Sequence, residues 1–147
     1  MVAVRAATAA DADAVTAAFL AARASAMPWL PRVHSDAATR HWVEHVVLGR
    51  LTTWVADEDD VVLGFAASGP GSLEHLYLLP DRQRQGIGSL LFRHVQERSP
   101  VGFTLHVFER NTAARAFYER HGCRVIATGD GSDNEEHEPD VTYRWRH

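Results

Sequence analysis

The sequence predicts one mixed α/β domain over residues 1–147, of the α+β kind. Two observations support this prediction. The chain has 147 residues, of which 46% are hydrophobic, so it can bury one core but is too short for two. Its apolar patterns also alternate between the two-residue period of strands and the 3.6-residue period of helices.

The first half of the chain predicts a strand, two helices and an antiparallel hairpin. An Ala-rich run follows a capping residue at Thr8 or Asp11. Prolines on both sides of Trp29 interrupt the helical pattern, and Ser35 or Asp36 can cap a second helix. An acidic turn then joins two apolar stretches. The expected elements are strand 2–5, helix 12–24, helix 36–48 and strands 52–56 and 61–68.

The second half predicts a strand, a glycine turn, a helix, a strand, a helix and two final strands. Leu90, Leu91 and Val95 form the apolar stripe of the first of these helices. Asn111 can cap the second helix, and Gly122 can end it. The expected elements are strand 73–79, turn 83–88, helix 89–98, strand 103–108, helix 112–121 and strands 124–128 and 141–145.

The composition argues against several classes of protein. The chain has 15 basic and 19 acidic residues, a net charge of −4, which disfavours binding to nucleic acid or anionic membranes. Every basic residue is arginine, so the absence of lysine excludes catalysis through a lysine Schiff base. Cys123 is the only cysteine, and no stretch reaches the length of a membrane span. We therefore expect a cytoplasmic protein without a signal peptide or membrane anchor.

The glycine turn lies between a predicted strand and a predicted helix, and this position favours a role in binding an anion. The first turn of a helix leaves backbone N–H groups unpaired, and glycine lets a pyrophosphate approach them closely. Arg84 would add a positive charge beside that anion. A dinucleotide-binding fingerprint does not fit, because it needs a small residue where Leu91 stands, and a P-loop needs a lysine.

The run Gln83–Gly88 resembles the acyl-CoA-binding motif of the Gcn5-related N-acetyltransferases, the GNAT superfamily, in which Gln/Arg-x-x-Gly-x-Gly opens a helix. The second part of that signature lies on the next strand and helix, and Cys123 stands where an aromatic residue is usual. The resemblance covers essentially the whole chain. The residues that match Asn-x-x-Ala-x-x-Phe/Leu-Tyr-x-x-x-Gly are Asn111, Ala114, Phe117, Tyr118 and Gly122.

This resemblance implies a mostly antiparallel mixed sheet, flanked by helices and splayed between its fourth and fifth strands. It also implies transfer of an acetyl group from acetyl-CoA directly to a primary amine of a small molecule or peptide, with no metal. The main chain of residues 76–78 would hold the pantetheine arm and the thioester carbonyl. The implied acetyl-CoA contacts are Leu76, Tyr77, Leu78, Gln83, Arg84, Gln85, Gly86, Ile87, Gly88, Ser89 and Asn111; Asn111 could instead serve only as a helix cap.

Acetyl transfer needs a neutral amine, a polarised carbonyl and a proton for the departing thiolate. An alkylamine with a pKa near 10 is only about 0.1% neutral at pH 7, so a base or desolvation must act. By resemblance, the Tyr118 hydroxyl is the general acid beside the sulfur, unless this aromatic residue only packs. His106 and Glu74 are rival candidates for the base, and a water chain could replace both.

The segment Asp130–Asp140 carries six acidic residues and no basic one, whereas the rest of the chain has 15 basic and 13 acidic residues. By resemblance it lies near the acceptor side, where it would attract a cationic amine; otherwise it is a solvated loop. Met27, Trp29, Leu30 and Trp42 would form an apolar wall of the acceptor pocket or part of the core.

Two other functions stay open on the sequence. His41, Glu44 and His45 match the His-x-x-Glu-His pattern of zinc proteases, with no further ligand apparent. A sensor module that binds acyl-CoA without transferring the acyl group is the other alternative, and Tyr118 argues mildly against it. A homodimer is a further expectation from the resemblance. The acceptor amine is not identified.

Overall fold

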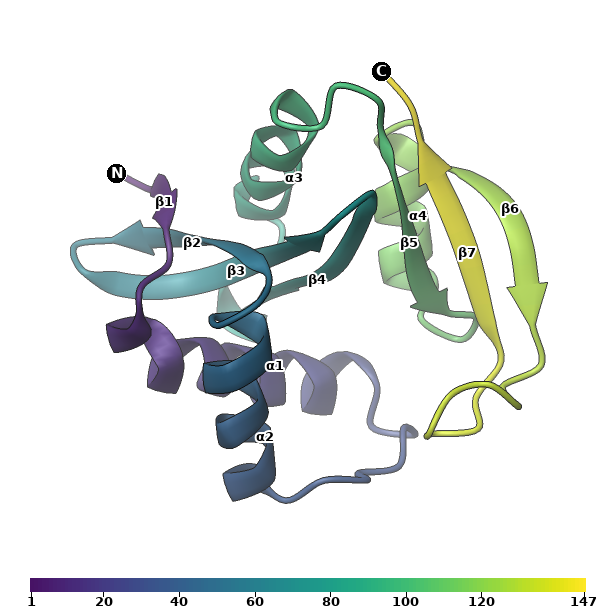
Figure 1. Cartoon of the computed structure of the whole chain (residues 1–147), viewed down its shortest axis with the longest axis horizontal. Helices are drawn as coiled ribbons and strands as arrows, with labels where there is room; N and C mark the ends of the chain where they lie inside the picture. The colour runs from purple at the N-terminus through teal and green to yellow at the C-terminus, as the bar shows by residue number, and fades with distance from the viewer.

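In the computed structural model, which describes all 147 residues, one seven-stranded sheet runs through the molecule with helices on both faces (Figure 1). Its spatial order is β1-β2-β3-β4-β5-β7-β6, and only β4 and β5 run parallel. The predicted mostly antiparallel sheet and the order of its elements are confirmed. The strands are β1 (Ala3–Ala6), β2 (Thr52–Glu58), β3 (Val61–Gly69), β4 (Ser72–Leu78), β5 (Phe103–Phe108), β6 (Arg124–Gly129) and β7 (Asp140–Trp145).

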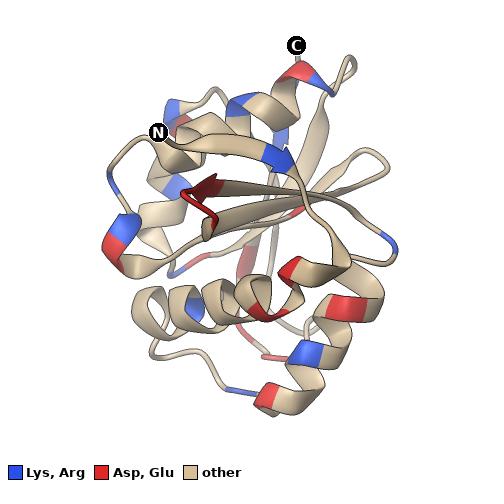
Figure 2. Ribbon diagram, turned by 90° about the vertical axis from the view of Figure 1, so that its left-hand side faces the viewer, with Lys and Arg blue, Asp and Glu red and all other residues tan.

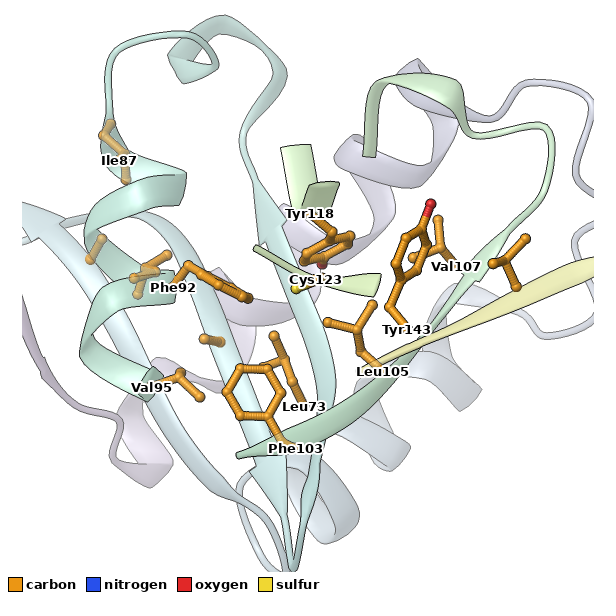
Figure 3. Packing of buried hydrophobic residues seen from close by; sticks show 14 of the residues in the cluster. Leu73, Ile87, Phe92, Val95, Phe103, Leu105, Val107, Tyr118, Cys123 and Tyr143 are labelled. Carbon is orange, nitrogen blue, oxygen red and sulfur yellow. The ribbon is translucent and has the colours of Figure 1, made fainter. Parts of the chain in front are cut away.

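The helices divide between the two faces of the sheet (Figure 1). The first pair shares one core cluster with β2 and β3, in which Val15 and Phe65 are fully buried. The second pair shares a larger cluster with β4, β5 and β7, in which Phe92 and Tyr143 are fully buried (Figure 3). The helices are α1 (Ala12–Ala26), α2 (Asp36–Trp42), α3 (Ile87–Glu97) and α4 (Thr112–Arg120).

Local sequence signals explain most element boundaries. The Ser35 hydroxyl accepts from the Ala38 amide and starts α2, as predicted. Asp59 and Asp60 both have positive φ, which fits a two-residue hairpin turn whose twist matches the strands. Helix α3 begins two residues earlier than expected because Gly86, at φ +81°, forms its N-cap.

The end of the predicted helix 36–48 differs from a regular α-helix. Residues Val43–Val47 form a π-helical turn, in which the Leu48 amide donates to the Val43 carbonyl at 2.8 Å. Helix α2 and the turn after it carry Asp36, Arg40 and Glu44 at intervals of four residues, so acidic and basic residues alternate there (Figure 2), and Arg40 bonds to Asp13 at 2.7 Å. This pair joins α2 to the start of α1.

Strand β4 contains a bulge that changes which face of the sheet its later side chains reach. Ala67 pairs with His75 and Ser68 with Leu73, so Glu74 is an extra residue without a partner on β3. Because side chains alternate along a strand, this extra residue reverses which face the later side chains reach. Leu73 therefore packs in the α3–α4 core, whereas Tyr77 packs against the α1 core.

We expect Phe92→Ala to lower the free energy of unfolding by about 3 to 5 kcal/mol, because a fully buried ring would leave a cavity between α3 and β5. The neighbouring Arg93 is exposed, so Arg93→Ala should change it by about 0.5 kcal/mol or less. Denaturant unfolding of both variants measures this difference. Equal effects of the two substitutions would contradict the assigned core.

Candidate active site

Strands β4 and β5 separate almost as soon as they begin. Their only paired residues are Ser72 and Thr104, so the predicted splay between the fourth and fifth strands is confirmed. The Leu79 amide donates to Leu63 of β3 at 2.9 Å. Main-chain groups alternate in direction along a strand, so those of Leu76 and Leu78 point toward β5 and meet no strand there.

The same alternation turns the main-chain groups of Tyr77 toward Phe65 of β3. Of the three predicted main-chain contacts to pantetheine, the geometry therefore favours Leu76 and Leu78. Both leave donors and acceptors that another molecule can satisfy, and an unpaired backbone group away from water is costly. The open edge of β4 is suited to bind an extended chain with amide groups.

A cavity of about 430 Å³ lies in this gap, and we call it the splay cavity. It is lined by β4, β5, α4, the end of α1 and part of the loop between β6 and β7. Several residues that the sequence analysis singled out therefore meet here although they are far apart in the chain. Those that line the cavity are Met27, Glu74, Leu76, Tyr77, His106, Asn111, Ala114 and Tyr118.

Tyr118 is the only buried residue of α4, and it reaches the splay cavity from the core (Figure 3). The rings of Phe92 and Phe117 hold it at centroid distances of 5.8 and 5.3 Å. Burial raises the pKa of the Tyr118 hydroxyl well above its usual value near 10. The hydroxyl is protonated at neutral pH, as an exposed tyrosine is, and burial makes it a weaker acid.

Cys123 packs beside Tyr118 in the core (Figure 3). Its amide donates to the Tyr118 carbonyl at 3.0 Å, which ties the end of α4 to the start of β6. Burial raises the pKa of the Cys123 thiol to about 12, so it is not a ready nucleophile. The cysteine fills core space where α4 ends and β6 begins.

The two candidate bases face the splay cavity from opposite strands. Glu74 on β4 is exposed, lies at the bulge and makes no ion pair or hydrogen bond through its carboxylate. His106 on β5 is also exposed, and its Nδ1 lies 2.9 Å from the Thr142 hydroxyl. That bond leaves Nε2 free. Each residue has the accessibility that a base needs.

His75 and Arg23 were missed by the sequence analysis, yet both line the splay cavity. His75 packs among Phe19, Trp42 and Tyr77, and burial lowers its pKa to about 4, helped by the positive charge of Arg23. It is therefore a neutral wall residue and a weak base. No local sequence signal marks these two residues, because their contacts join distant parts of the chain.

The glycine turn opens α3 at the end of β4 that lies away from Ser72. Side chains 83–86 are exposed, and Arg84 takes the left-handed conformation with φ +63°. No amide from Gln83 to Ser89 donates to a protein acceptor; the first helical bond runs from Leu90 to Gly86 at 3.0 Å. Seven amides without a protein acceptor therefore lie in and just before the first turn of α3, next to the exposed Arg84, which is the composition of an anion site.

Gly88 lets α3 approach α4 closely, because a Cβ there would lie 3.3 Å from the Phe117 ring. Next to it, the Ser89 hydroxyl lies 2.9 Å from His121 Nε2. His121 Nδ1 lies 2.7 Å from the Phe117 carbonyl, which can only accept, so Nε2 of a neutral ring accepts from Ser89. Ser89 therefore keeps only its amide free for a ligand.

The Asn111 side chain caps α4, since its Oδ1 accepts from the Ala114 amide at 3.3 Å. Its Nδ2 makes no hydrogen bond in the chain, and Asn111 lines the splay cavity. The two roles that the sequence left open for Asn111 are thus compatible.

The acidic loop between β6 and β7 lines two cavities, but half of its acidic residues are engaged. Glu135 lies 2.9 Å from His34, Glu136 lies 3.3 Å from Arg23 and Glu138 lies 3.1 Å from Arg110. These glutamates fasten the loop to α1, to the segment before α2 and to the segment between β5 and α4, so they do not form a free acidic rim. Two loop carboxylates without an ion pair, those of Asp133 and Asp140, line the splay cavity.

A second cavity of about 790 Å³ adjoins the splay cavity between α1, α2 and the connecting loop. Arg23, Met27 and His75 line both cavities. Met27, Leu30 and Trp42 line the second cavity, as expected for an apolar wall. Trp29 does not, because it packs against Phe108 and Arg110 instead.

The residues of the zinc-protease pattern lie in α2 and in the π-helical turn that follows it. The rings of His41 and His45 stack at 4.0 Å, and Glu44 bonds to Arg40 at 2.8 Å. No group of three or more His, Cys, Asp or Glu side chains is arranged to hold a metal. No helix is both long and apolar enough to cross a membrane.

The sequence matches the family described as "Acetyltransferase (GNAT) domain" over residues 49–124, just over half of the chain. The chain belongs to the GNAT family. This match includes β4, the glycine turn, α3, β5 and α4, which contain most of the residues that line the splay cavity. The suspected resemblance is confirmed.

Among curated relatives, "Peptidyl-lysine N-acetyltransferase YjaB" of Salmonella typhimurium is 37% identical over 82 residues. The alignment covers 54% of this chain and 55% of that protein, so the chain matches about half the length of this relative. The name gives the acceptor of that protein as a peptide lysine.

Solved structures share the GNAT fold over nearly the full chain. The solution structure of apo YjaB from Escherichia coli has a TM-score of 0.78 at 23% identity, covering 99% of this chain and 97% of that one. The PaiA N-acetyltransferase of Thermoplasma acidophilum, solved in complex with coenzyme A, has a TM-score of 0.74 at 15% identity. That alignment covers 100% of this chain and 99% of the other. At these identities the likeness establishes the fold.

His75 should make stability depend on pH. Its folded pKa of about 4 lies below the unfolded value of 6.5, so the unfolded state binds a proton first as the pH falls. The contribution of neutral His75 is complete above pH 6.5 and is lost between pH 6.5 and 4, by about 3 kcal/mol. Denaturant unfolding across this range should show a smaller fall for His75→Phe than for wild type. Parallel curves would contradict the buried neutral state.

Proposed function

We propose that residues 1–147 form one GNAT N-acetyltransferase domain that moves an acetyl group from acetyl-CoA directly to a primary amine of a peptide or small molecule. The observation that carries the proposal is the open edge of β4, which runs from a buried, protonated tyrosine to a helix start with free amides. These features suit the three parts of acetyl-CoA: thioester, pantetheine and pyrophosphate.

The proposed binding mode uses groups that the protein itself leaves unpaired. The pyrophosphate lies at the glycine turn, where the amides from Gln83 to Ser89 and the Arg84 guanidinium bind it. Pantetheine adds to β4 through the main chain of Leu76 and Leu78, and the Asn111 amide donates from α4. A GNAT-fold protein solved with coenzyme A supports the cofactor assignment.

In the proposed reaction the amine nitrogen attacks the thioester carbonyl carbon, and the carbon–sulfur bond then breaks. The Tyr118 hydroxyl gives its proton to the departing thiolate, since Tyr118 lines the splay cavity beside β4 and its hydroxyl is protonated at neutral pH. The amine loses its proton to Glu74 or to His106 Nε2, either directly or through water. The reaction needs no metal and no covalent acetyl-enzyme intermediate.

The acceptor is proposed to enter as a cation. Glu74, Asp133 and Asp140 line the splay cavity without an ion pair, whereas Arg23, the one arginine there, is bonded to Glu136. The remaining field is negative and favours a protonated amine. The names of the YjaB relatives support a lysine side chain of a peptide as one acceptor.

A homodimer and a cytoplasmic location stay part of the proposal. Strand β6 is an edge of the sheet, and all six of its residues are exposed, including Val125 and Ile126. An uncovered edge with apolar side chains is a surface at which a second copy can add. The unpaired Cys123 thiol suits a reducing compartment.

An acceptor panel tests the activity. Purified protein with acetyl-CoA should release thiol when given lysine peptides or other cationic amines. The chain contains no lysine, so any acetyl-lysine signal in a mixture comes from the acceptor and not from the enzyme. Acetyl-CoA binding without thiol release on any amine would favour the sensor alternative, and stoichiometric zinc at His41 and His45 would favour the protease.

Tyr118→Phe should lower kcat about a hundredfold and leave the KM for acetyl-CoA nearly unchanged, because only the proton donor is lost. Tyr143→Phe is the matched control: its hydroxyl bonds to Glu119 and Arg115 and does not line the splay cavity. Full turnover by Tyr118→Phe would reject this acid.

A further inference from the structure

A third cavity lies at the opposite end of the sheet from the splay, around the place where β4 and β5 still pair. Its volume is about 1040 Å³, larger than that of either cavity at the candidate active site, and it shares no lining residue with them. It is formed by β2, the β3–β4 turn, the end of α3 and the end of β7. We call it the arginine cavity, after Arg50, Arg98, Arg144 and Arg146 in its wall.

The charge of this cavity is unusual for an acidic chain. Four arginines line it and no aspartate or glutamate does. Arg50, Arg144 and Arg146 make no salt bridge, whereas Arg98 lies 3.9 Å from Glu97 and 5.1 Å from the centre of the Trp54 ring. Clustered like charges repel one another, and a bound anion would relieve that repulsion.

Hydroxyl groups add uncharged donors to the same wall. Thr52, Ser68 and Ser72 come from three successive strands and all line the cavity. The Ser68 hydroxyl is buried and has no hydrogen-bond partner in the protein. Protein atoms cover that hydroxyl, so the hydroxyl donors that a ligand in the cavity can reach are those of the exposed Thr52 and the half-buried Ser72.

We propose that the arginine cavity binds a small polyanion with two or more phosphate or carboxylate groups, separate from the acetyl-CoA site. Several guanidinium groups can each form paired, charge-assisted hydrogen bonds to such groups. The cavity is concave and of the size that holds small ligands, which favours a small molecule over a nucleic acid. The ligand would lie against Ser72, where β4 leaves β5.

The four tryptophans of the chain allow a site-specific test. Trp54 and Trp145 line the arginine cavity, whereas Trp29 and Trp42 do not. Pyrophosphate and, in a second series, citrate are titrated at constant ionic strength while the four indole N–H signals are followed by NMR. At least one anion should shift Trp54 and Trp145 to saturation and leave Trp29 and Trp42 in place. Anion binding at the glycine turn alone would move neither cavity signal.

Charge variants make the test sharper. Arg144→Gln with Arg146→Gln should weaken the binding roughly tenfold or more, because two charge-assisted contacts are lost. Arg50→Gln, in an exposed turn, should weaken it less without risk to the fold. The control pair Arg93→Gln and Arg120→Gln removes the same charge outside the cavity and should leave it unchanged. Equal binding by all variants, or no selective shift with either anion, would overturn the proposal.

Discussion

Strands β4 and β5 share a single residue pair, Ser72 with Thr104, and the candidate active site depends on their separation beyond it. A strand edge without a partner inside a protein is unfavourable, because its amides and carbonyls lose water without gaining hydrogen bonds. Here the open edge faces a cavity, so a ligand can supply the missing bonds. The proposed acetyl-CoA site is thus an edge of β4 that no strand covers.

The rest of the fold keeps this gap open and places chemistry beside it. The bulge at Glu74 allows β4 to contribute Leu73 to one core and Tyr77 to the other, so both faces anchor the strand. Across the gap, the aromatic residues around Tyr118 fix α4 against α3. The separation is therefore held from both sides by packing, and the cofactor does not have to create it.

The sequence predicted the parts of the site that depend on local pattern. The glycine turn, the Asn111 cap and Tyr118 follow from short motifs, and the splay follows from the family resemblance. Arg23 and His75 could not be found in this way, because their roles arise from contacts between α1, β4 and the loop after β6. The acidic loop shows the same limit: its charge was evident, but its pairing with His34, Arg23 and Arg110 was not.

We propose that the open edge of β4 binds acetyl-CoA with its thioester next to Tyr118. A crystal structure of the protein with acetyl-CoA would test this binding mode. We expect the thioester sulfur within about 3.5 Å of the Tyr118 hydroxyl and the pyrophosphate on the amides from Gln83 to Ser89. Acetyl-CoA bound outside the gap between β4 and β5, or with its sulfur far from Tyr118, would rule out this binding mode.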